Sequence, residues 1–136
     1  MMKTFAILFT LILSEFAFGQ TTLSVQVNNI PTDEGKILFG LYSEDTFMKA
    51  APDYSQSAVV KDHSATVVFE NIPEGEYAVS CFQDKNMNQK FDFEPNGMPA
   101  EPYGVSNDAP SSYGPPQWSD AKFTVAKESV SLEINF

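Results

Sequence analysis

Apolar and polar positions alternate along most of the chain in short runs. In the run from Thr22 to Val27, the residues Leu23, Val25 and Val27 fall on one face of an extended chain. No segment keeps a helical period over three turns. Alternation with a period of two is typical of strands that bury one face, so the pattern predicts an all-β fold.

Six segments carry this strand pattern, and turn residues separate them. They are Thr22 to Val27, Lys36 to Tyr42, Ala65 to Ile72, Glu76 to Phe82, Lys122 to Ala126 and Val130 to Phe136. The second is almost continuously apolar, which predicts a central position in a sheet, and the short turn "KES" joins the last two. We expect one domain, an antiparallel β-sandwich of about seven strands, of the transthyretin-like or immunoglobulin-like kind.

Two of the predicted connections are long. The first runs from Ser43 to Ser64, and because Ser43 or Asp45 can cap a helical turn, we expect one short helix there, over a sheet edge. The second runs from Gln83 to Asp120 and holds six of the nine prolines. Loops of more than about 15 residues are usually functional or disordered, so the long Pro-rich loop is the first place to look for a site.

The amino terminus has the pattern of a secretory signal peptide. Lys3 precedes an apolar run from Phe5 to Leu13, and the small residues Ala17 and Gly19 follow it. The run is shorter than the about 20 apolar residues that span a bilayer as a helix, and no later run is longer. We therefore expect residues 1–19 to be a signal peptide and residues 20–136 to form an exported domain, periplasmic or extracellular, without a membrane span.

The net charge of the chain limits the kinds of molecule that it could bind. Removing residues 1–19 takes away Lys3 and Glu15, which leaves 7 lysines and 17 carboxylates, and the net charge stays at −10. The sequence has no arginine, the usual bidentate reader of phosphate. This balance argues against nucleic acids and anionic lipid surfaces, and cations are the natural counterpart.

Few residues offer catalytic chemistry. Cys81 is the only cysteine and shares a strand face with Tyr77 and Val79, so we expect a small buried side chain. His63 is the only histidine, and no serine lies in a nucleophile-elbow motif. One His and one Cys in unrelated positions do not make a zinc site, and the protein is predicted to be non-enzymatic.

The Pro-rich loop opens with "DKNMNQKFD", from Asp84 to Asp92. Asp84, Asn86 and Asn88 occupy its first, third and fifth positions, the carbonyl of Lys90 falls at the seventh and Asp92 at the ninth. Ca²⁺ takes about 6 to 8 oxygen ligands, and alternate residues of one tight loop can surround it. The spacing therefore predicts a Ca²⁺ site.

The loop is not an EF-hand, because its twelfth position is Pro95 instead of a bidentate Glu and no flanking helices are evident. It looks more like the shorter Ca²⁺ loops that connect strands in extracellular proteins. Its sixth position is Gln89, where a left-handed backbone favours Gly by about 1 kcal/mol or more, which weakens the match. Only two of the side-chain ligands are charged, which predicts an affinity of about 10⁻⁴ to 10⁻³ M unless Glu94 or Glu101 joins them. The alternative is a polar turn whose Asn and Asp side chains bond their own backbone.

The order "GEYAVSCFQDKNMNQKFD", then "NGMPAEPYGVSND", then "AKF" resembles the uncharacterised secreted bacterial domain of unknown function family 2141. The resemblance covers nearly all of residues 20–136. Its most specific part is the Asp-Asn-Asn-Asp loop followed by Gly97, Pro99, Glu101, Gly104 and Ser106. The family usually has Gly at the position of Gln89. The resemblance implies a β-sandwich and carries no established activity.

Two other functions stay open at this point. A carbohydrate-binding or cell-surface adhesion module would use the aromatic loop 101–118, through Glu101, Tyr103, Tyr113 and Trp118, because exposed rings stack on sugars. A small hydrolase would use paired carboxylates such as Asp92 and Glu94. The biological ligand and the oligomeric state are open, because edge strands of an open sandwich can pair between chains.

Overall fold

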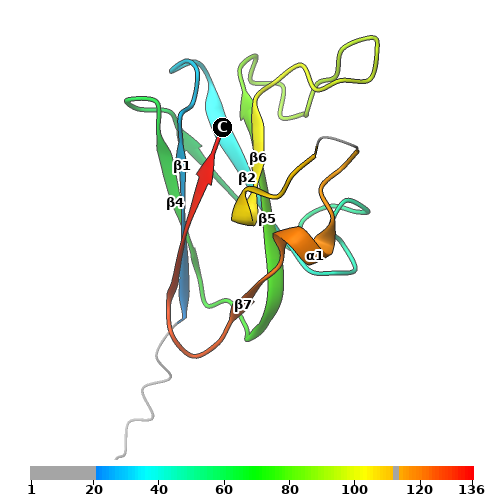
Figure 1. Cartoon of the computed structure of the whole chain (residues 1–136). Coiled ribbons are helices and arrows are strands. Elements are labelled where there is room, and N and C mark those ends of the chain that lie inside the picture. The colour runs from blue at the N-terminus through cyan, green and yellow to red at the C-terminus, as the bar shows by residue number, and fades with distance from the viewer. Residues whose placement is uncertain (1–20, 112–113) are drawn as a thin grey trace, which may run out of the picture.

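The computed structural model describes residues 21–111 and 114–136, and it confirms the all-β sandwich. The predicted signal peptide and Tyr113 lie outside the described residues. Figure 1 shows the two layers of strands edge-on. The strands are β1 (Thr22–Asn28), β2 (Lys36–Tyr42), β3 (Tyr54–Val59), β4 (Ala65–Glu70), β5 (Gly75–Asp84), β6 (Tyr103–Val105), β7 (Phe123–Val125) and β8 (Val130–Asn135).

One sheet has three strands in the order β4-β1-β8. The other has five, in the order β3-β2-β5-β6, with β7 also paired to β5. All pairs are antiparallel except β1 with β8, which run parallel. The first and last strands of the described chain therefore lie side by side.

The core lies between the sheets and follows the predicted alternation. In β1, Leu23, Val25 and Val27 are fully buried, and the residues between them are partly exposed. Cys81 is buried among these apolar side chains, as predicted. Burial raises the pKa of its thiol far above the ordinary value, so this cysteine stays protonated.

All six predicted strands are present, with ends within two residues or so of the predicted ones. Two strands were not predicted, β3 and β6, and both lie in the segments predicted to be loops. β3 has the sequence "YSQSAV" and is exposed on both faces, so it carries no alternation. Its place is set by backbone pairing with β2 along one edge.

The prediction of a short helix near Ser43 is wrong. Residues 44–49 form consecutive turns, in which the N–H groups of Phe47 and Ala50 donate to the carbonyls of Ser43 and Thr46. Met48 has a left-handed φ of 57°, which ends the helical path. Within the described residues, the helical turn is α1 (Trp118–Ala121) instead, beside the 3₁₀ turn η1 (Ser106–Asp108).

The turn "KES" joins strands of different sheets. β7 pairs with β5 and β8 pairs with β1, so this turn crosses the edge of the sandwich and does not close a hairpin. Within residues 21–111 and 114–136, no helix has the length and apolar character that crossing a membrane takes.

The turn before β2 fixes the end of β5. Gly35 has a φ of 64°, and a Cβ built on it would lie 2.0 Å from the carbonyl oxygen of Asp84. The turn can approach β5 this closely because Gly35 has no side chain. The position of Asp84 therefore depends on Gly35.

We expect Gly35→Ala to lower the free energy of unfolding by at least about 2 kcal/mol, since the backbone of β5 must move and φ is unfavourable. Gly97→Ala is the matched control, because Gly97 has a φ of 86° but nothing within 4 Å of a built Cβ. It should cost about 1 kcal/mol. Denaturant unfolding of both variants measures the difference, and equal losses would contradict the close contact.

Candidate functional site

The predicted metal loop leaves the sandwich at the end of β5. Asp84 is the last residue of that strand and is fully buried. Its Oδ1 accepts the N–H of Asn88 at 3.2 Å, and its Oδ2 accepts the N–H of Gln89 at 2.8 Å. The chain therefore curls around this carboxylate.

The next alternate residues repeat the same bond. Asn86 Oδ1 accepts the N–H of Asn88 at 3.3 Å, and Asn88 Oδ1 accepts the N–H of Lys90 at 2.9 Å. Met87 and Gln89 between them have left-handed φ values of 59° and 62°. This backbone turns the side chains of Asp84, Asn86 and Asn88 to the inside of the loop.

The carboxylate of Asp92 accepts hydrogen bonds from the amide groups of the two asparagines. Asn86 Nδ2 donates to its Oδ2 at 2.9 Å, and Asn88 Nδ2 donates to both carboxylate oxygens at 2.9 Å. The bonds from Asn88 and then Asn86 lower the pKa of the Asp92 carboxyl. The structure thus brings together the four predicted side chains. For Lys90 it shows the backbone bond to Asn88, and ligation by the Lys90 carbonyl stays a prediction.

Glu101 ties the two ends of the loop. It is 7% exposed, and its two carboxylate oxygens accept the N–H groups of Lys85 and Asp92, each at 3.0 Å. Two residues on opposite sides of the loop therefore share one buried carboxylate. The segment around Glu101 braces the loop from outside the run of nine residues.

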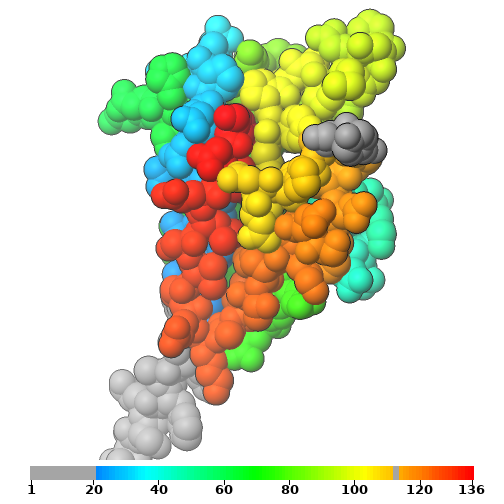
Figure 2. Space-filling model, viewed as in Figure 1, coloured from blue at the N-terminus to red at the C-terminus, as the bar shows by residue number. Residues whose placement is uncertain are grey.

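The predicted ligand atoms are oxygens, which would suit a hard cation such as Ca²⁺ and not zinc. Counting only His, Cys, Asp and Glu, the described part of the chain has no group of three or more that could hold a metal. Two of the four predicted ligand side chains in the loop are Asn, which would offer neutral amide oxygens to a cation. Figures 1 and 2 show that the loop projects from one end of the sandwich.

The predicted aromatic platform is divided between two places. Tyr103 packs on Phe91 with ring centroids 5.7 Å apart, and its hydroxyl bonds Ser111. Trp118 packs on Phe47, 5.9 Å away, in a separate cluster near α1. Tyr113 lies outside the described residues.

Phe91 is a residue of this region that the sequence did not predict. Its ring packs on Phe82 of β5 in a tilted contact at 5.1 Å and on Tyr103 of β6 in a T-shaped contact at 5.7 Å, so it anchors the predicted metal loop on the outer face of the five-stranded sheet. Phe91 and Phe93 are also in contact at 4.9 Å. The alternating "FDF" at the end of the loop was the available signal.

We expect Glu101→Gln to lower the free energy of unfolding by about 1 to 3 kcal/mol, because one amide N–H then loses its acceptor. Hydrogen exchange at Lys85 and Asp92 should become faster. Glu94→Gln is the control, since Glu94 is exposed in the same loop and its side chain makes no recorded bond to the described residues. Equal exchange in the two variants would contradict the bracing role.

The Asp92 carboxyl also predicts a dependence of stability on pH. Its pKa is lower in the folded protein than the ordinary value of 3.8, so the folded state binds its proton less readily than the unfolded state. The stabilisation is therefore complete above pH 3.8 and is lost as the pH falls through the lower, folded value. The difference in melting temperature between the wild type and Asp92→Asn should narrow below pH 3.8, and a constant difference would refute the assignment.

Comparison with known proteins gives a family. The sequence model of a family described as "Uncharacterized protein conserved in bacteria (DUF2141)" matches residues 25–133. No curated protein and no solved structure matches this chain.

Proposed function

The chain belongs to the DUF2141 family of uncharacterised bacterial proteins, and from its loop we propose that it is an exported, non-enzymatic binding module with a structural Ca²⁺ site. The ligands would be Asp84, Asn86, Asn88, the Lys90 carbonyl and Asp92. The proposal of export rests on the signal-peptide pattern of residues 1–19.

The buried carboxylate of Asp84 carries the proposal. It is fully buried and accepts two backbone N–H groups. Among the described residues it has no Lys or His partner. A buried anion without a counter-charge is costly, and a bound cation supplies that charge.

The conformation of the loop also supports the site. Each of Asp84, Asn86 and Asn88 uses an oxygen to accept a backbone N–H two to five residues further on. These bonds hold the oxygens on one side of the loop while leaving each a second lone pair. A bound Ca²⁺ would attract the carboxylates of Asp84 and Asp92 and so hold the two ends of the loop together.

A polar turn without a metal would make the same hydrogen bonds. The two alternatives therefore differ only in whether a cation is bound. Two features favour the ion over the bare turn. Asp84 and Asp92 place two negative charges in one loop, and Met87 and Gln89 both adopt the strained left-handed backbone. A cation would offset both the repulsion and the strain.

Catalysis by the carboxylates has little support. A general acid needs a raised pKa, and the bonds from Asn88 and Asn86 lower the pKa of Asp92. His63 bonds the Ile30 carbonyl at 2.7 Å in a distant turn. Cys81 is buried and protonated. We therefore propose a role in binding and not in turnover.

Thermal unfolding of residues 20–136 tests the proposal, first in chelator and then in rising Ca²⁺, with Mg²⁺ for comparison. A ligand that binds only the folded state at about 100 times its Kd stabilises by about 2.7 kcal/mol, which is several degrees for this size of domain. We expect Ca²⁺ to raise the midpoint and Mg²⁺ to raise it less.

Asp92→Asn should abolish most of the Ca²⁺ effect, because it removes one of two charged ligands. Glu133→Gln removes the same charge from an exposed position on β8 and should leave the effect intact. If Ca²⁺ does not move the midpoint of the wild type, or moves both variants equally, the loop is a polar turn.

A further inference from the structure

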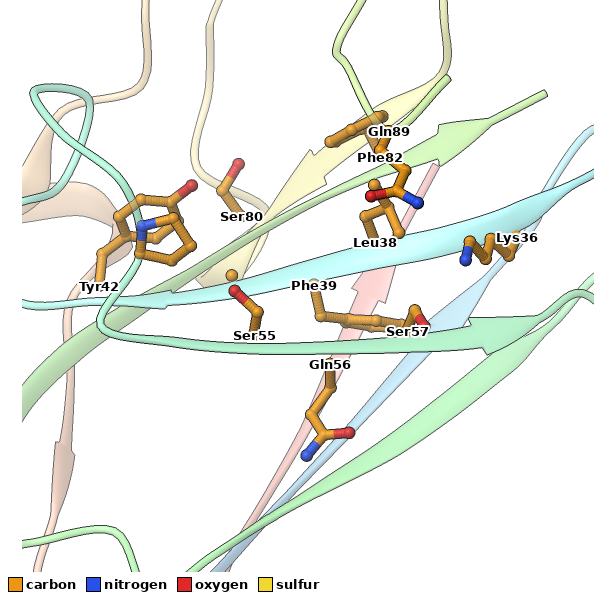
Figure 3. Close-up of a pocket in the computed structure, with 12 residues that line it drawn as sticks. Lys36, Leu38, Phe39, Tyr42, Ser55, Gln56, Ser57, Ser80, Phe82 and Gln89 are labelled. Atoms are coloured by element: carbon orange, nitrogen blue, oxygen red, sulfur yellow. The ribbon is translucent and has the colours of Figure 1, made fainter. Parts of the chain in front are cut away.

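A groove of about 540 Å³ lies on the outer face of the five-stranded sheet. Its residues come from β2, β3, β5, the predicted metal loop and, at Pro52, the connection before β3 (Figure 3). Pockets that bind small molecules measure about 300 to 1,000 Å³, so the groove has the size of a ligand site.

Strand register builds the floor of the groove in two rows. Leu38 of β2 lies opposite Ser57 of β3 and Phe82 of β5. In the next row, Gly40 lies opposite Ser55 and Ser80. These positions face away from the core, because Ile37, Phe39 and Leu41 of β2 point into it. The floor is therefore a mixture of apolar surface and hydroxyl groups.

Aromatic rings lie toward both ends of the groove. At one end Tyr42 lies over Gly40, where a built Cβ would come within 2.7 Å of the Tyr42 ring. At the other end Phe82 is covered in part by Phe91 from the metal loop, with centroids 5.1 Å apart. Figure 3 shows the side chain of Gln89 beside Phe82 at this end.

Gln89 links the groove to the metal loop. Its backbone N–H bonds Asp84 at 2.8 Å, its φ is 62°, and its side chain lines the groove. Gly would adopt this φ without strain, at a saving of about 1 kcal/mol. Because Gln89 keeps this backbone strain while its side chain lines the groove, we infer that the side chain has a function there.

The charge of the groove is unlike that of the chain. The protein has a net charge of −10, yet no lining residue is a carboxylate. The one charged residue is Lys36, which forms no ion pair with any described residue. The groove thus offers hydroxyls, amides, ring faces and one free cation.

We propose that this groove binds an oligosaccharide that carries a carboxylate, with Lys36 holding the acid group. Ring faces at Tyr42 and Phe82 pack on the C–H faces of sugar rings. Ser55, Ser57 and Gln89 supply neutral donors and acceptors for hydroxyl groups. From Leu38 to Tyr42 the floor is roughly 13 Å long, enough for a short oligosaccharide.

The proposal rests in part on the Ca²⁺ site. Lys36 lies opposite Asp84 in the register of β2 and β5, so a cation in the loop would lie close to the acid group of the sugar. Bound Ca²⁺ would offset the charges of Asp84 and Asp92 there. More distant carboxylates are screened over about 8 Å at physiological salt. Ca²⁺ should therefore tighten sugar binding.

Binding to an array of uronate-containing oligosaccharides tests the inference, with each sugar paired to its neutral methyl ester, in Ca²⁺ and in chelator. We expect at least one uronate sugar to bind, and its methyl ester to bind about tenfold more weakly. Lys36→Gln should remove that preference. Lys127→Gln, in the exposed turn after β7, should not change it.

Ser55→Trp fills the groove from an exposed edge strand and should abolish binding while the melting temperature is kept. Binding of no uronate sugar, or binding that survives both Lys36→Gln and Ser55→Trp, would overturn the proposal. The Ca²⁺ melting curve is a separate readout. If Ca²⁺ stabilises the fold and no sugar binds, only the groove assignment fails, and if sugar binds without any Ca²⁺ effect, only the metal site fails.

Discussion

The carboxylate of Asp84 is the point on which the candidate site depends. It lies buried at the end of β5, where the turn at Gly35 presses against its backbone. Its two oxygens accept N–H groups from Asn88 and Gln89 and so set the path of the loop. The same path brings the ring of Phe91 onto Phe82 on the outer face of the sheet. One charged group thus connects the sandwich, the loop and the groove.

The loop also divides the outer face of the five-stranded sheet. One end of that face is covered by the cluster around Phe47, Ala78 and Trp118, and the other by Phe91, which packs on Phe82 and Tyr103. The floor between them stays open. Two of the aromatic residues predicted to form a platform, Tyr103 and Trp118, pack within these two clusters instead. The groove lies between the two clusters, over β2, which the sequence predicted only as a central strand.

How far the sequence could predict the structure depends on the range of the interactions. Alternation in β1 and the spacing of Asp84, Asn86, Asn88 and Asp92 are local, and the predicted strands and the convergence of the loop are both present. β3 was missed because it has no buried face. The groove could not be predicted, because it depends on the register between Leu38, Ser57 and Phe82, which no local pattern encodes.

The parallel pair of β1 and β8 has a consequence for how the chain folds. Thr22 and Ser129 bond each other across 107 residues, so the three-stranded sheet cannot close until almost the whole chain is available. Contacts this distant in sequence make folding slow. The three-stranded sheet of a newly made chain would therefore stay incomplete until synthesis is almost finished. A chain that stops before β8 would leave one edge of β1 unpaired and would lack Ile134 in the core.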